Sequence, residues 1–208
     1  MIYLYYLITI IIGYLIGSLN FSIIIGKLFY KTDVREHGSK NAGATNTLRT
    51  LGTVPGLVVF VLDTLKAVIA FLIVSLIPYG MPVSGYLAAA AASLGHNYPV
   101  FFGFKGGKGV TVSLGMLFCF SPVVGILTLG VGVLVIFFTR YVSLGSMLAT
   151  LVSPLFTIFF FKGECKPLVF TLNLLLAVQI ILRHKSNIRK LLNGNESKIS
   201  FSKKGNRK

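Results

Sequence analysis

Charged residues are scarce in this sequence. Only 12% of its 208 residues are charged, whereas 54% are hydrophobic and the mean hydropathy is +0.82. A soluble domain carries about 25% charged residues, so this chain has roughly half the charge that a water-exposed surface needs. The shortage excludes a disordered chain and a conventional soluble enzyme, and it predicts a membrane protein.

Acidic residues are the scarcest of the charged types. Five Asp and Glu stand against 20 Lys and Arg, which gives a net charge of +15. Such a charge is typical of proteins that bind nucleic acid, anionic lipid headgroups or phosphorylated small molecules. Because the hydropathy argues against nucleic acid, we expect membrane lipids and phosphorylated substrates as partners.

Cysteine is also rare, and several catalytic patterns are missing. Cys119 and Cys165 lie in apolar surroundings without CxxC spacing, which excludes a secreted disulfide scaffold and predicts two small hydrophobic residues. There is no HExxH, GxSxG, paired Cys/His set or carboxylate pair in a polar loop, so we expect no metal and no other cofactor. None of the three histidines is followed five residues later by Asp, so the His–Asp dyad of many acyltransferases is absent.

Apolar runs make up most of the chain. A helix needs about 20 apolar residues to cross a membrane. Candidate spans lie at 3–25, 54–76, 83–101, 142–161 and 167–182. The run 110–138 would be about 44 Å long as one helix, beyond a hydrocarbon core of about 30 Å, and Pro122 is a natural break. Splitting it into 110–120 and 122–138 predicts an all-α polytopic membrane fold with seven transmembrane helices, one of them short.

The positions of Lys and Arg predict the orientation. Short cytoplasmic loops collect these residues, and seven spans with the N-terminus outside place 17 of the 20 on the cytoplasmic side. Six spans would put Arg140 and the tail outside. The first charge is Lys27, so no basic segment precedes the first apolar run and we expect that run to remain as a span. The expected organisation is a membrane domain at 1–192 and a basic, polar cytoplasmic tail at 193–208.

A polar cluster at 33–49 follows the first span. Its glycines would let the backbone approach a ligand closely, and its side chains are suited to phosphate. The candidate ligand groups are the hydroxyls and amides of Ser39, Asn41, Thr45 and Asn46 and the guanidinium of Arg49. The alternative is a polar connector that caps a helix.

A second cluster at 95–109 precedes the short span. Gly106, Gly107 and Gly109 flank Lys108, a pattern that can form a nest of N–H groups at a helix N-terminus and bind phosphate. It is neither a Walker A loop nor a dinucleotide fingerprint. A flexible turn is the alternative.

Further polar residues follow in the same loops and beyond. His96 is better explained alone as a hydrogen-bonded structural residue, and Ser143 follows the anchoring Arg140. In the basic run 183–190, His184 and Asn187 are three apart and share a helix face, although a membrane-surface helix is the default for such a run.

Two charges interrupt the apolar run at 54–76. Asp63 and Lys66 are three residues apart, the spacing of neighbours on one face of a helix. A single buried charge is costly, so we expect the two to form a mutual ion pair, with a functional role as the alternative.

Together these segments resemble the bacterial acyl-phosphate:glycerol-3-phosphate acyltransferase family. The resemblance rests on GSLNF at 17–21, REHGSKNAGATNTLRTLG at 35–52, DTLK at 63–66, GHNYPVFFGFKGGKGV at 95–110, RYVSLGS at 140–146 and RHKSNIRKLLNG at 183–194. It implies a bacterial inner-membrane enzyme that makes lysophosphatidate, with its site facing the cytoplasm. Docking of a soluble enzyme that produces acyl phosphate is left open.

The resemblance also implies residue roles. The expected catalytic residues are Ser39, Asn41, Arg49, Lys108 and His184, and the expected substrate-binding residues are Thr45, Asn46, His96, Asn97, Gly106, Gly107, Gly109, Ser143 and Asn187. His96 and Asn97 are expected to support the site from behind. The chain departs from the family pattern at Thr111 and Val112, where Ala-Thr is usual, so the role of that threonine is not carried over.

A small transporter of an organic phosphate is the alternative function.

Overall fold

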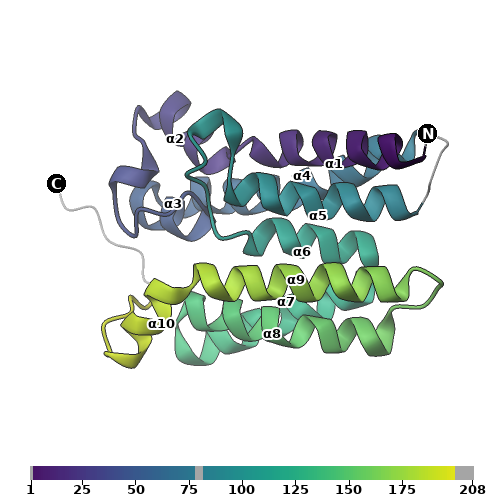
Figure 1. Ribbon diagram of the computed structural model, residues 1–208. Helices are drawn as coiled ribbons and strands as arrows, with labels where there is room; N and C mark the ends of the chain where they lie inside the picture. Colours follow the sequence, from purple (N-terminus) through teal and green to yellow (C-terminus); the bar gives the residue numbers. More distant parts are fainter. Residues whose placement is uncertain (1, 78–81, 200–208) are drawn as a thin grey trace.

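The structure is a computed structural model that describes residues 2–77 and 82–199, and its regular elements there are helical (Figure 1). The α-helices are α1 (Ile2–Ser18), α2 (Phe21–Tyr30), α3 (Ala44–Leu51), α4 (Thr53–Ser75), α5 (Val83–Asn97), α6 (Val110–Phe120), α7 (Pro122–Thr139), α8 (Val142–Phe160), α9 (Lys166–Arg183) and α10 (Lys185–Leu192). Two 3₁₀ turns, η1 (Val34–Glu36) and η2 (Val100–Phe102), lie in the polar loops.

Within the described ranges, five helical segments are long and apolar enough to cross a membrane. They are Ile2–Tyr30, α4, α7, α8 and α9, and α6 is a shorter apolar helix. Large apolar side chains face outward, and Phe137 and Phe138 are 66% and 77% exposed. Exposure of such a large apolar surface to water is unfavourable, whereas contact with lipid chains is not. The chain is therefore an all-α membrane protein.

The helix boundaries follow local chemistry. The predicted break at Pro122 is confirmed: Ser121 is extended and Pro122 opens α7. The predicted span 83–101 is too long, because α5 ends at Asn97. Pro99 disfavours helix at the residue before it, and Tyr98 accordingly leaves the helical conformation.

The first predicted span, 3–25, is also broken. The chain leaves α1 after Ser18, and the side chain of Asn20 caps α2 by accepting a hydrogen bond from the N–H of Ile23 at 3.2 Å. The carbonyl of Leu19, released by this break, accepts a hydrogen bond from Lys66 Nζ at 3.0 Å. A residue on α4 therefore satisfies a backbone group that the broken helix leaves open.

Lys66 also forms the predicted ion pair. Its Nζ lies 2.9 Å from Asp63 Oδ1, and both side chains are buried. The same ammonium lies 2.9 Å from Nδ1 of His96 on α5. One buried network thus joins α4 to the α1–α2 break and to the end of α5.

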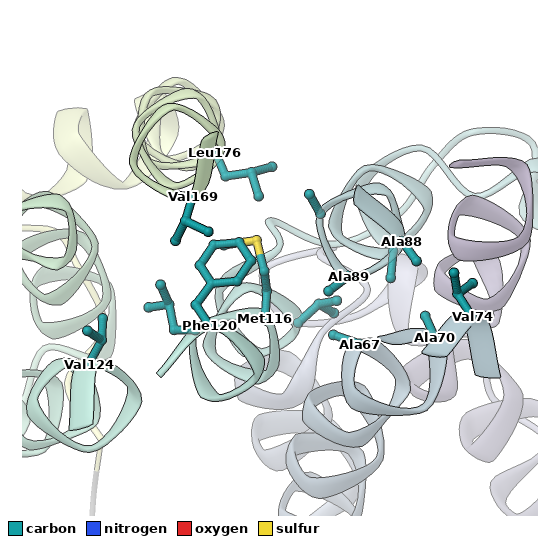
Figure 2. Packing of buried hydrophobic residues seen from close by; sticks show 14 of the residues in the cluster. Ala67, Ala70, Val74, Ala88, Ala89, Met116, Phe120, Val124, Val169 and Leu176 are labelled. Carbon is teal, nitrogen blue, oxygen red and sulfur yellow. The ribbon is translucent and has the colours of Figure 1, made fainter. Parts of the chain in front are cut away.

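Helix α6 lies at the centre of the core. Figure 2 shows Met116 and Phe120 of α6 between Val169 and Leu176 of α9 on one side and the small residues of α4 and α5 on the other. Close packing on the far side of α5 depends on glycine: a Cβ on Gly17 of α1 would lie 2.5 Å from the Cα of Ala92.

The polar segments gather at one end of the bundle. In Figure 1, α2, α3, α10 and the loop between α5 and α6 lie at the same end, opposite the N-terminus. Antiparallel apolar helices produce this arrangement, because every second connection returns to the same side. The polar clusters at 33–49 and 95–109 and the basic run 183–190 therefore lie at the same end.

Candidate functional site

A cavity of about 560 Å³ opens at the polar end. Its wall comes from the loop before α3, the loop before α6 and the junction of α9 with α10. The lining includes the cations Arg35, Lys40, Lys105, Lys108, Arg183 and Lys190. Among the described residues that line it none is acidic, so the cavity has a strongly positive potential.

The loop before α3 contributes Ser39 and Asn41 to the lining. Asn46 shapes this loop from inside: its Oδ1 accepts from the N–H of Ser39 at 2.8 Å, and its Nδ2 donates to the carbonyl of Val34 at 2.7 Å. Asn46 is buried and is not among the lining residues. The structure thus places Asn46 as the residue that shapes the loop presenting Ser39.

Arg35 joins the first two polar loops, a contact that sequence reasoning missed. Its guanidinium donates to Asp33 at 2.7 and 3.0 Å and to the carbonyl of Phe102 at 3.0 Å. The Arg35 guanidinium holds the pKa of the Asp33 carboxyl well below its usual value. The positive charge of Arg35 is therefore already compensated by Asp33, although Arg35 lines the cavity.

The glycine-rich loop is held from two sides. The N–H of Gly107 donates to the carbonyl of His96 at 3.1 Å, and Arg183 Nε donates to the carbonyl of Gly107 at 2.8 Å. A Cβ on Gly107 would meet the His96 ring and come within 2.6 Å of the Ala42 carbonyl oxygen. Gly109 has a φ of +88° and opens α6, which only glycine adopts without strain.

His96 and Asn97 lie behind this loop, outside the cavity lining. His96 is tied to Lys66, as described above. Asn97 is fully buried, and among the described residues neither polar atom of its side chain has a hydrogen-bond partner. A Cβ on Gly109 would lie 2.8 Å from both of those atoms, so Asn97 closes the space beneath the loop.

A chain of polar contacts joins Lys108 to α8 and α10. Lys108 Nζ donates to Asn187 Oδ1, Asn187 Nδ2 donates to Glu196 Oε1 at 2.9 Å, and Ser143 Oγ donates to the same oxygen at 3.0 Å. Glu196 is only 7% exposed. One carboxylate therefore organises residues from three separate parts of the sequence.

Glu196 is the main site residue that sequence reasoning missed. It falls in the predicted polar cytoplasmic tail, and residues 193–199 of that tail fold back onto the site. Arg49 donates to the carbonyl of Ser197 at 3.2 Å, and the N–H of Ile199 donates to the carbonyl of Arg140 at 2.8 Å. The available signal was a single acid within a basic tail.

Burial lowers the pKa of two titratable groups in the site. Burial lowers the pKa of Lys108 to about 8, with Glu196 acting in the opposite direction. Burial, and then the charge of Lys108, lower the pKa of His184 to about 4, so His184 is neutral at pH 7. Its Nδ1 lies 2.8 Å from the carbonyl of Ile180, which can only accept, so Nε2 is left as an acceptor.

The predicted residues thus fall into three groups. Ser39, Asn41, Gly106, Lys108 and Asn187 line the cavity, and Ser143 joins it through Glu196. Asn46, His96, Asn97, Gly107 and Gly109 shape or support the loops. Arg49 is exposed on α3 with its side chain on Ser197, Thr45 is half-buried on α3, and His184 is buried at the end of α9. Among the described residues, no group of three or more His, Cys, Asp or Glu side chains could hold a metal ion.

Sequence comparison gives one family. A family model described as glycerol-3-phosphate acyltransferase matches residues 7–194. A glycerol-3-phosphate acyltransferase from Halalkalibacterium halodurans is 43% identical over 196 residues, covering 92% of this chain and 94% of that protein. One from Clostridioides difficile is 41% identical over 202 residues, covering 95% and 97%.

Solved structures agree with the sequence relatives. The crystal structure of PlsY (YgiH), an integral membrane glycerol 3-phosphate acyltransferase, in its glycerol 3-phosphate form matches with a TM-score of 0.84 and 39% identity. That match covers 94% of this chain and 96% of the other. The lysophosphatidic acid form of the same enzyme matches with a TM-score of 0.81 and 38% identity.

Proposed function

This chain belongs to the glycerol-3-phosphate acyltransferase family, and we propose that it transfers an acyl group from an acyl phosphate to glycerol 3-phosphate. The products are lysophosphatidate and inorganic phosphate. The observation that carries the proposal is the cavity lined by cations and, among the described residues, by no acid. Both substrates carry a phosphate group, and both must enter that cavity.

The site residues have complementary roles in this proposal. Lys108 and Arg49 neutralise phosphate charge, and Ser39, Thr45 and the loop Gly106–Gly109 donate hydrogen bonds to phosphate oxygens. Ser143, whose hydroxyl donates to Glu196, supports the site through that carboxylate. Asn187 positions Lys108 through its amide oxygen. Asn41 and His184 orient the glycerol hydroxyl, since neutral His184 has an acceptor on Nε2.

The reaction needs little from the protein beyond positioning. An acyl phosphate is a mixed anhydride and is already activated, so the enzyme has to align two groups and hold developing charge. The hydroxyl oxygen bonds to the acyl carbon, the bond from that carbon to the phosphate oxygen breaks, and the hydroxyl proton ends on the released phosphate. We expect direct attack without an acyl-enzyme. Trapping an acylated side chain in the absence of glycerol 3-phosphate would contradict it.

A comparison of donors tests the function. The purified protein in lipid vesicles is given glycerol 3-phosphate with either an acyl phosphate or the corresponding acyl thioester. We expect lysophosphatidate and inorganic phosphate in equal amounts from the acyl phosphate, and no product from the thioester. Product from the thioester alone would show that the donor is wrong although the family is right.

The finer topology is part of the proposal. Seven spans, with α5 and α6 as the short ones, an outside N-terminus and a cytoplasmic C-terminus place the cavity on the cytoplasmic face of a bacterial cell membrane. The charge distribution supports this orientation, because the cavity and its six lining cations lie at the end of the bundle where α2, α3 and α10 gather. The division into a membrane domain at 1–192 and a tail at 193–208 remains a prediction.

A further inference from the structure

Arg183 is held in an unusual position at the edge of the cavity. It is the last residue of α9, and its Nε donates to the carbonyl of Gly107 at 2.8 Å. Its guanidinium carbon lies 4.7 Å from the ring centroid of Tyr98. Two contacts, both from the connection between α5 and α6, therefore fix the plane of the guanidinium and its rotation within that plane.

The two terminal amino groups of this guanidinium make no hydrogen bond to residues 2–77 or 82–199. Of the three guanidinium nitrogens of Arg183, only Nε has a hydrogen-bond partner among the described residues, and no described acid forms an ion pair with Arg183. Arg183 nevertheless lines the cavity. Arg35 differs in this respect, because its guanidinium donates hydrogen bonds to Asp33 and to the carbonyl of Phe102. A guanidinium held by Nε with its two terminal amino groups left over is suited to bidentate phosphate binding.

The surroundings of Arg183 indicate which phosphate it takes. The contacts of Lys108, Asn187, Ser143 and Glu196 run toward α8 and α10, on the polar side. Arg183 instead ends an apolar helix and stacks on Tyr98, whose carbonyl accepts from Tyr14 Oη of α1 at 2.6 Å. An acyl phosphate must keep its chain among apolar helices while its phosphate reaches the polar end, and Arg183 lies at that junction.

We propose that Arg183 binds the phosphate of the acyl donor, which becomes the leaving group, and at the same time anchors the glycine-rich loop through Gly107. The proposal rests on the acyl-phosphate function proposed above. Because one guanidinium serves both partners, a lysine can replace its charge but cannot make both contacts. Glutamine can still donate to Gly107 but has no charge for the phosphate.

Two variants, Arg183→Lys and Arg183→Gln, test the contact with the donor phosphate. In each we expect the KM for acyl phosphate to rise about 10- to 100-fold, because a charged hydrogen bond to phosphate is lost or weakened. The KM for glycerol 3-phosphate should stay near the wild-type value. Inorganic phosphate, competing with acyl phosphate, should show a Ki raised by a similar factor, a shift that a purely structural role would not produce.

Arg189 provides the matched control. It is an exposed arginine on α10 outside the cavity lining, and Arg189→Lys and Arg189→Gln should leave all of these constants unchanged. A rise confined to the KM for glycerol 3-phosphate, or unchanged constants in both Arg183 variants, would overturn the proposal. If Arg183→Gln fails to fold, Arg183→Lys decides alone. Wild-type protein inactive with acyl phosphate would refute the proposed function itself.

Discussion

Lys108 links the chemistry of the site to pH. Its pKa is lowered to about 8 by burial, and only its charged form can neutralise phosphate. The charge is present below pH 8 and is lost as the pH rises through that value, so substrate binding should weaken on the alkaline side. Lys108→Arg should move this alkaline limb upward, because guanidinium stays charged. A profile of kcat/KM against pH for both proteins checks this, and coincident limbs would contradict it.

Two substitutions of Glu196 should separate the effect of its hydrogen bonds from the effect of its charge. Glu196→Ala leaves the buried donors of Ser143 and Asn187 unpaired, at a cost of about 1–3 kcal/mol each, so the thermal midpoint of the solubilised protein should fall clearly. Glu196→Gln keeps an acceptor oxygen, so we expect it to stay folded. It removes the negative charge that raises the pKa of Lys108, and the alkaline limb should therefore move to lower pH. An alkaline limb that stays in place would argue against this coupling.

Some of these residues could be predicted from sequence and others could not. Lys108 and Ser39 lie in polar loops of an apolar chain and Asn187 lies in the basic run 183–190, so the sequence pattern makes them candidates, and the family resemblance implies their roles. Arg35, Arg183 and Glu196 have their roles through partners that are distant in the sequence, such as Phe102, Gly107 and Ser143. No local pattern encodes those pairings.

The glycine-rich loop is the element on which the site depends. Gly107→Ala would push a methyl group against the His96 ring and the Ala42 carbonyl, so the loop must shift and Lys108 with it. We expect acyl transfer to fall at least about tenfold, since small misplacements of catalytic groups are costly. Gly130→Ala on α7 is the matched control, because its Cβ would meet nothing within 4 Å. Equal activity in the two variants would show that the loop tolerates displacement.

At the scale of elements, hydropathy predicts the apolar helices well and their interruptions poorly. The break at Pro122 has a local cause, and it was predicted. The break after Ser18 depends on the Asn20 cap and on Lys66, which reaches from α4 to the carbonyl of Leu19. The short helix α3 within the first polar loop was likewise missed, because its apolar pattern is weak. Tertiary contacts decide these cases.

At the scale of the whole molecule, the charge distribution predicts that the cavity faces the cytoplasm. A reporter fused to the C-terminus that is active only in the cytoplasm should be active, and a matching reporter at the N-terminus should not. The opposite result would reverse the orientation. The position of the cavity also bears on the alternative function, because a transporter site is expected near the membrane midplane, whereas this cavity is lined by loops at one end of the bundle.

The measurement that tests the central claim most directly compares wild type with Lys108→Ala in one assay. Both purified proteins, with folding checked by their thermal midpoints, receive acyl phosphate and glycerol 3-phosphate in vesicles. We predict equal amounts of lysophosphatidate and inorganic phosphate from the wild type and no lysophosphatidate from the folded variant. Near-normal turnover by Lys108→Ala would contradict the location of the active site in this cavity.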